Sequence, residues 1–219
     1  MFLKNLRIIR TICSELYISI VITLLSISSW SVFVLFFRPI YYWSVSLLHI
    51  EQTSGFSKER ILENYNALID YFSPWVSGTL SLPSLTQSTS GIQHFCEVKD
   101  IFNLLLAFIP IMLILLIIYF ILTRKNENLH YLKTASIVML LVPLIVGIGF
   151  LIDFNRTFTI FHKIFFRNNY WLFDPSTDPV IQILPENFFM LCGIIIILFQ
   201  FLMSLLCFLF YRRWKRKSA

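Results

Sequence analysis

Residues 91–123 read GIQHFCEVKDIFNLLLAFIPIMLILLIIYFILT, a mostly polar beginning that leads directly into a long apolar run. The apolar part, residues 101–123, is long enough to cross a bilayer as a helix, which takes about 20 residues. His94, Glu97 and Asp100 lie just before it. Ionisable groups are costly to place at the edge of a membrane, so this group of side chains indicates a functional site.

The composition of the whole chain is that of a polytopic membrane protein. Of 219 residues, 57% are hydrophobic and only 14% are charged, whereas soluble domains are closer to half apolar and a quarter charged. Further apolar runs predict spans at about 13–37, 134–152 and 188–211. The first is too long for the apolar region of a signal peptide. We therefore expect an all-α membrane protein with four transmembrane helices, forming one integral membrane domain over residues 1–219.

The positive charges predict the orientation of these helices. Most of the 18 Lys and Arg residues lie in three short segments beside the apolar runs: before residue 13, at 124–133 and after residue 211. Such segments remain on the cytoplasmic side, and the pattern does not favour nucleic-acid binding. Both termini should then be cytoplasmic. The two long polar segments, 38–100 and 153–187, should form an extracytoplasmic cap.

One helix of the cap can be predicted from the sequence. Ser57 is a suitable N-cap for a helix that continues to about Phe72. Ile61, Tyr65 and Leu68 recur at helical spacing along it, which predicts one apolar face. Upstream, Arg38-Pro39 should end the first transmembrane helix, because the residue before proline disfavours helical geometry. Residues 73–90 are rich in Ser, Thr, Pro and Gly and are expected to form a loop.

Two histidines of the outer segments are candidate catalytic groups. If a helix begins at Ser90 or Gly91, His94 and Glu97 share one face and Glu97 can orient the imidazole. Asp100 then falls on a different face. His162 lies 68 residues further on in an aromatic segment, where a short helix is expected. That segment is either a plain amphipathic helix at the interface or the wall of an aromatic pocket for acyl chains.

The motifs of other catalytic classes are missing from the sequence. There is no nucleophile elbow, phosphate-binding loop or HExxH motif, and the four cysteines have neither CxxC nor zinc-like spacing. No metal and no cofactor are expected. Two alternatives remain open: a metal-dependent membrane hydrolase with His94, Glu97 and His162 as ligands, and a non-enzymatic accessory or binding subunit of the membrane.

Several short motifs, in order and in matching topology, resemble those of the lipoprotein intramolecular transacylases (Lit), bacterial membrane proteins with four helices. They are His-x-x-Glu-Val-x-Asp at 94–100, His162, Trp-x-Phe-Asp-Pro at 171–175, Asp178, Leu-Pro-Glu-Asn-Phe-Phe at 184–189 and Leu16-Tyr17. The resemblance implies a cap over four helices and two catalytic histidines, His94 and His162. It offers a set of candidates for supporting or substrate-binding roles: Glu97, Asp100, Asp153, Tyr17, Asn168, Asn169 and Trp171.

The resemblance also implies a reaction and a location. The sn-2 acyl chain of a diacylglyceryl-modified lipoprotein would move to the α-amine of its N-terminal cysteine, giving the lyso-form lipoprotein. The partners would be that diacylated lipoprotein, in the outer leaflet, and membrane lipids. The protein would reside in the bacterial cell membrane with its active site on the extracytoplasmic face.

Overall fold

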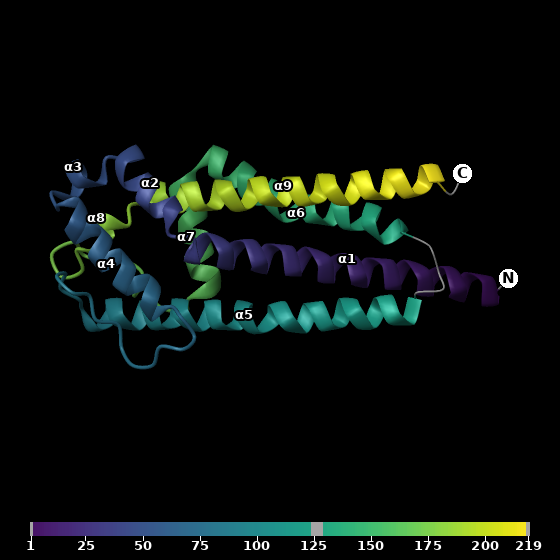
Figure 1. Cartoon of the computed structure of the whole chain (residues 1–219), viewed down its shortest axis with the longest axis horizontal. Coiled ribbons are helices and arrows are strands. Elements are labelled where there is room, and N and C mark those ends of the chain that lie inside the picture. The colour runs from purple at the N-terminus through teal and green to yellow at the C-terminus, as the bar shows by residue number, and fades with distance from the viewer. Residues whose placement is uncertain (1, 124–128, 218–219) are drawn as a thin grey trace. The chain divides into compact units, whose positions relative to one another are not determined.

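A computed structural model describes residues 2–123 and 129–217, and every regular element in these ranges is a helix (Figure 1). The all-α prediction is therefore confirmed. In chain order the helices are α1 (Phe2–Phe36), α2 (Pro39–Leu47), α3 (Ile50–Ser54), α4 (Lys58–Tyr71), α5 (Thr89–Thr123), α6 (His130–Ile152), α7 (Phe154–Phe165), α8 (Val180–Ile183) and α9 (Glu186–Lys217).

Four helices are long and apolar enough to cross a membrane, as predicted. They cover Thr11–Phe36, Thr89–Thr123, His130–Ile152 and Glu186–Lys217. The largest difference from the predicted bounds is the start of α5, which begins twelve residues before the apolar run at 101. A helix continues as far as its backbone is capped, whereas hydropathy marks only its apolar part. Arg124 and Lys125, which belong to the predicted inner loop, lie outside the described residues.

The chain divides into two compact units. Unit 1 comprises residues 1–30, 106–148 and 196–219, and unit 2 comprises residues 31–105 and 149–195. Both segments predicted to form the cap, 38–100 and 153–187, belong entirely to unit 2.

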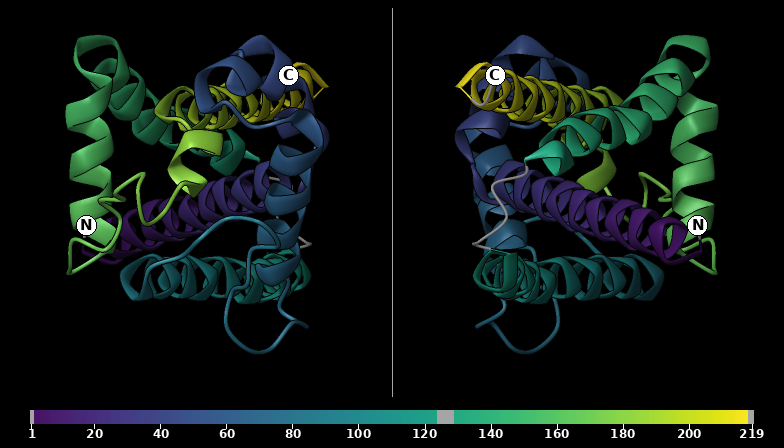
Figure 2. Two further views of the ribbon diagram at one scale, coloured as in Figure 1. Left: turned by 90° about the vertical axis from the view of Figure 1, so that its left-hand side faces the viewer. Right: turned by 90° about the vertical axis from the view of Figure 1, so that its right-hand side faces the viewer.

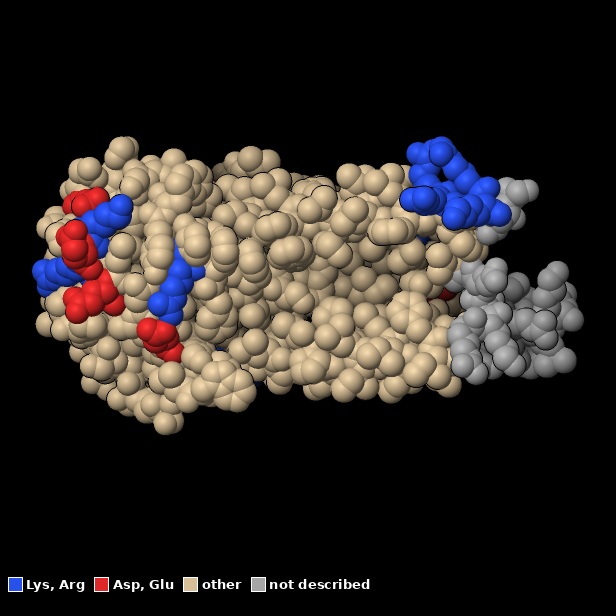
Figure 3. All heavy atoms as spheres, viewed as in Figure 1, with Lys and Arg blue, Asp and Glu red and all other residues tan. Residues whose placement is uncertain are grey.

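Buried polar side chains join the helices of unit 1. The Ser26 hydroxyl donates to Gln200 Oε1 at 2.8 Å, which links α1 to α9. Ser204 donates to the Ser136 carbonyl at 2.6 Å and links α9 to α6. Such bonds between helices are favoured in a membrane, where water cannot satisfy these groups. At its C-terminal end α9 carries Lys215, Arg216 and Lys217, and Figure 3 shows basic side chains gathered there.

An aromatic core holds unit 2 together around α4. Ser57 accepts a hydrogen bond from the Arg60 amide and caps this helix, and Ile61, Tyr65 and Leu68 are buried, as the sequence predicted. Tyr41 of α2 stacks on Tyr65 with ring centroids 3.6 Å apart. Its hydroxyl donates to the Ile183 carbonyl of α8 at 2.6 Å. Helix α8 lies against α3 and α4 (Figure 2), so these short helices share one core.

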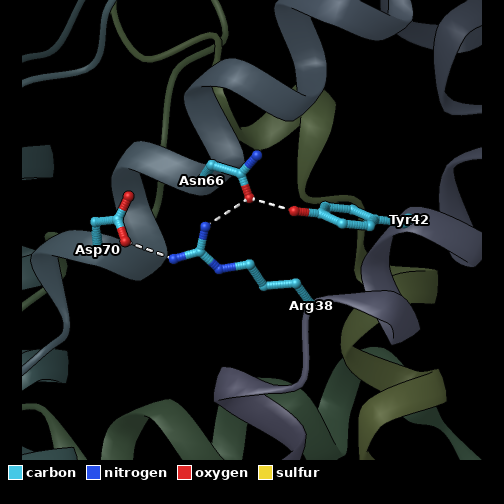
Figure 4. A network of polar contacts seen from close by, with 4 residues as sticks. All are labelled: Arg38, Tyr42, Asn66 and Asp70. Atoms are coloured by element: carbon cyan, nitrogen blue, oxygen red, sulfur yellow. Dashed lines mark hydrogen bonds and ion pairs between the residues drawn. The ribbon is translucent and has the colours of Figure 1, made fainter.

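A polar network ties the end of α1 to α4 (Figure 4). The Arg38 guanidinium forms an ion pair with Asp70 and donates to Asn66 Oδ1 at 3.1 Å. The Tyr42 hydroxyl donates to the same oxygen at 2.7 Å. Helix α1 ends at Phe36 and α2 begins at Pro39, so the predicted break at Arg38-Pro39 is confirmed. The network fixes the position of α4 relative to that break.

Asp178 holds the beginning of α5. The Ser88 hydroxyl accepts from the Gly91 amide at 2.9 Å and caps the helix. Asp178 Oδ1 in turn accepts from the Ser88 amide at 2.8 Å, and Oδ2 accepts from the Thr177 hydroxyl at 2.8 Å. The Asp178 side chain is only 4% exposed. A carboxylate at this end of a helix is stabilised by the helix dipole.

Gly91 is the residue that allows Asp178 to approach α5. A Cβ atom at this position would overlap Asp178 Oδ1 and lie 3.2 Å from the ring of Phe173. Because the carboxylate is buried and bonded on both oxygens, it has little room to move away. The first turn of α5 therefore depends on the absence of a side chain at residue 91.

We expect Gly91→Ala to destabilise the protein by about 1–3 kcal/mol, as overpacking does, and to lower the midpoint of thermal unfolding by about 2–10 °C. Thermal unfolding of the purified protein in detergent measures this shift. The matched control is Gly147→Ala on α6, where a Cβ atom would meet only Ile197 Cδ1 at an ordinary 3.9 Å. An equal effect of the two substitutions would show that the Asp178 contact is unimportant.

Candidate active site

His94 lies near the start of α5 and is surrounded by aromatic rings. It is 5% exposed. The ring of Phe166 meets it edge-on at 4.7 Å and that of Phe173 at 5.5 Å. Its Nδ1 atom is buried and has no hydrogen-bond partner within the described part of the chain. The imidazole thus lies in an apolar setting, with one buried nitrogen that no described residue satisfies.

His162 lies near the end of α7, the short helix that the sequence predicted, and is 9% exposed. Trp171 stacks on the imidazole with centroids 4.7 Å apart, and Phe158 lies at 4.1 Å. Nδ1 is 2.8 Å from the Phe158 carbonyl oxygen. A carbonyl oxygen can only accept, so Nδ1 carries the proton. In the neutral ring Nε2 is then the free base.

Burial lowers the pKa of His162 below its ordinary value, while the hydrogen bond to Phe158 opposes the shift. A buried imidazole without a carboxylate partner is favoured in its neutral form. Histidine in that form can accept a proton at neutral pH. The environment of His162 therefore suits a general base.

The two imidazoles lie together in unit 2. Their ring centroids are 6.0 Å apart and the ring planes are inclined by 36°. Phe166 contacts both rings, at 4.7 Å from His94 and 5.6 Å from His162. A centroid distance of this size lets both rings reach the same small group of a substrate, and the aromatic neighbours limit the access of water. The arrangement is suited to acid–base chemistry by two histidines.

Glu97 connects the surroundings of the two histidines. It follows His94 by three residues in α5, so the two side chains share one face of the helix, as expected if the helix began near Ser90. Its Oε1 accepts from Asn168 Nδ2 at 2.8 Å. The Asn168 carbonyl accepts from Trp171 Nε1 at 3.1 Å, and Trp171 stacks on His162. Glu97 Oε2 is buried and unpartnered among the described residues.

The other predicted supporting residues lie in different settings. Asp153 caps α7 by accepting from the Arg156 amide at 2.9 Å. Asp100 is exposed on α5, and Asn169 is also exposed. Tyr17 belongs to unit 1, where it is 50% exposed on α1. The structure thus places Trp171 against His162, links Glu97 to it through Asn168, and gives Asp153 a helix-capping role.

Sequence reasoning overlooked two contributions to the site. Phe166 was one of many aromatic residues in its segment, yet it is the ring that touches both histidines. Asp178 was noted only as part of a motif, yet it supports the helix that carries His94. Asp178 follows Asp174, Ser176 and Thr177 in a polar, proline-containing stretch, so no sequence signal distinguished it from its neighbours.

The described residues contain no group of three or more His, Cys, Asp or Glu side chains placed to hold a metal ion. His94, Glu97 and His162 were the ligands of the alternative hydrolase, and they do not converge in that way. The alternative therefore has no geometric support.

Comparison with known proteins identifies the family. The model of the lipoprotein intramolecular transacylase Lit matches residues 16–189. The solved structure of the membrane-integral transacylase Lit from Bacillus cereus is 33% identical, with a TM-score of 0.89 over 94% of this chain and 96% of that chain. A histidine-to-arginine variant of that enzyme is 32% identical, with a TM-score of 0.85 over 100% of this chain and 98% of that chain.

No match is found among curated protein sequences. The family model nevertheless covers most of the chain, and the solved transacylases match it over nearly their whole length. The chain therefore belongs to the lipoprotein intramolecular transacylase family, the integral membrane transacylases of lipoprotein maturation.

Proposed function

We propose that this protein moves the sn-2 acyl chain of a diacylglyceryl-modified lipoprotein to the α-amine of its N-terminal cysteine, using His94 and His162 as the catalytic pair. One observation carries the proposal: two buried imidazoles lie 6.0 Å apart, measured between ring centroids, with aromatic rings around them.

The bonds made and broken suit two histidines. The α-amine nitrogen attacks the sn-2 ester carbonyl, a C–N bond forms, and the bond between that carbon and the glyceryl oxygen breaks. Starting from the ammonium form, the nitrogen loses two protons: one ends on the glyceryl oxygen and the other is released to water, so the protein returns to its starting state. The product carries an amide at its N-terminus and a free hydroxyl at sn-2.

His162 is the general base in this proposal. An α-amine with a pKa of about 7.7–8.0 is mostly protonated at neutral pH and must lose a proton to react. Nε2 of His162 is the free base because Nδ1 donates to Phe158. His94 then supplies an N–H that stabilises the oxyanion, and the imidazolium formed on His162 gives its proton to the leaving glyceryl oxygen.

The substrate carries both reacting groups, so the protein mainly needs to fold one molecule back on itself. Well-oriented intramolecular reactions reach effective molarities of about 10⁵–10⁸ M, equivalent to roughly 7–11 kcal/mol of the barrier. Phe166, Phe173 and Trp171 supply firm apolar walls for that purpose. No nucleophilic side chain is needed.

The orientation follows from charge. We infer that residues 38–100 and 153–187 face the outside and that both termini are cytoplasmic, because the basic end of α9 is retained inside. The site would then be open to lipoproteins in the outer leaflet of the bacterial cell membrane.

We expect His94→Ala and His162→Ala each to reduce formation of the lyso-form lipoprotein by at least about 100-fold, since general acid–base groups contribute 10²–10⁴. Mass spectrometry of the N-terminal lipopeptide from cells expressing each variant measures the conversion. His130→Ala is the control, because His130 lies in unit 1 beside Tyr211 and should be close to wild type. Normal conversion by either site variant would exclude that histidine from the mechanism.

The lowered pKa of His162 has a direct spectroscopic consequence. An exposed histidine is about half protonated at pH 6.5. Because burial lowers the pKa of His162, its ring should remain mostly neutral at that pH, with the proton on Nδ1. ¹⁵N NMR of histidine-labelled protein in detergent reports both properties, and the signal that disappears in His162→Gln gives the assignment. Half protonation at pH 6.5, or a proton on Nε2, would contradict the assignment of His162 as base.

A further inference from the structure

Glu97 has a carboxylate of which only one oxygen is satisfied. Oε1 accepts from Asn168, and Oε2 is buried with no hydrogen-bond partner within the described residues. Nor does any basic side chain of the described residues form an ion pair with it, the one such pair being Arg38–Asp70. A buried acceptor that stays unpaired costs free energy, and more so when it is charged. A hydrogen-bond donor from a bound ligand would therefore stabilise Glu97 Oε2, since no described residue provides one.

Glu97 lies on the same helical face as His94 and is linked through Asn168 to the surroundings of His162. Three residues separate it from His94 on α5, which brings the two side chains to neighbouring turns of one face. On its other side the Asn168–Trp171 hydrogen bond leads to the ring stacked on His162. The hydrogen bond from Asn168 fixes the orientation of the carboxylate, so Oε2 is preorganised to accept a hydrogen bond.

We propose that Glu97 Oε2 binds the α-ammonium group of the substrate's N-terminal cysteine and holds it beside the histidines before its proton is removed. The inference rests on the proposed function and names the residue that recognises the amine. Of the groups near the reacting ester, the ester oxygens only accept hydrogen bonds and the acyl chains are apolar. The ammonium is the one cationic donor, with N–H bonds suited to a carboxylate.

This contact makes the site selective for lipoproteins with a free N-terminus. A lipoprotein whose amine is already acylated offers Glu97 only a neutral amide N–H and no positive charge, so the charge-assisted hydrogen bond is lost. Hydrogen bonds to charged groups contribute enough for about a 10- to 100-fold difference in affinity.

The test compares two synthetic diacyl lipopeptides that carry an ether in place of the sn-2 ester, so that no transfer occurs. One has a free α-amine and the other is N-acetylated. Their affinities for the purified full-length protein in detergent are measured at pH 6.5, where the amine is protonated. Wild type should prefer the free amine by about 10- to 100-fold. Glu97→Gln should reduce the preference to about twofold or less, because glutamine keeps the acceptor for Asn168 but loses the charge.

Glu63→Gln is the matched control, since Glu63 is an exposed glutamate on α4 of the same unit, and it should keep the wild-type preference. The N-acetylated ligand should bind wild type and Glu97→Gln equally, which shows that the site is intact. A wild-type preference in Glu97→Gln would overturn the inference, as would an equal loss of affinity for both ligands in that variant. Conversion of the ester-containing lipopeptide by wild type is measured in parallel, and its absence would reject the proposed function instead.

Discussion

The carboxylate of Asp178 holds the first turn of α5 through the Ser88 amide, and the position of His94 depends on this contact. The close approach requires Gly91, because any side chain there would displace the carboxylate. Phe173 packs at the same place and contacts the His94 ring. One buried polar interaction thus sets both the helix that carries His94 and part of the aromatic wall.

The rest of unit 2 gives this arrangement its rigidity. Tyr41 and Tyr65 stack at the centre of the core and join α2 to α4, while the Arg38 network fixes the other side of α4. Near the histidines, Trp171 is bonded through its indole N–H and stacked on His162. A reaction that depends on folding one substrate molecule back on itself benefits from walls that do not move. The abundant aromatic side chains of this chain supply many of these rigid contacts.

The sequence allowed the main features of the fold to be predicted because each left a local pattern. The four apolar runs, the Ser57 cap and the break at Arg38-Pro39 depend on neighbouring residues, and all three appear in the structure. The helical spacing of His94 and Glu97 is likewise local. The apolar run alone placed the start of this span at 101, whereas α5 begins at Thr89, close to the start at Ser90 or Gly91 considered for the His94–Glu97 pair. The contact that holds this start comes from Asp178, a residue distant in the chain.

Long-range contacts also decided which candidate side chains reach the site. Asn168 and Asn169 are adjacent and chemically identical, and only a contact across 71 residues shows that Asn168 binds Glu97. Asp153 was a candidate for a supporting or substrate-binding role, and as the residue before α7 its carboxylate caps that helix. The family resemblance suggested the same supporting role for all three residues, whereas their tertiary contacts show that they differ.

The central claim is that His94 and His162 act as one unit on a single substrate. Single-turnover rates of acyl transfer in His94→Ala, His162→Ala and the double variant test it most directly. Residues that act together show strongly non-additive effects, so the double variant should be about as slow as the slower single variant. A double variant slowed by the product of the two single effects would show that the histidines act independently and would contradict the account.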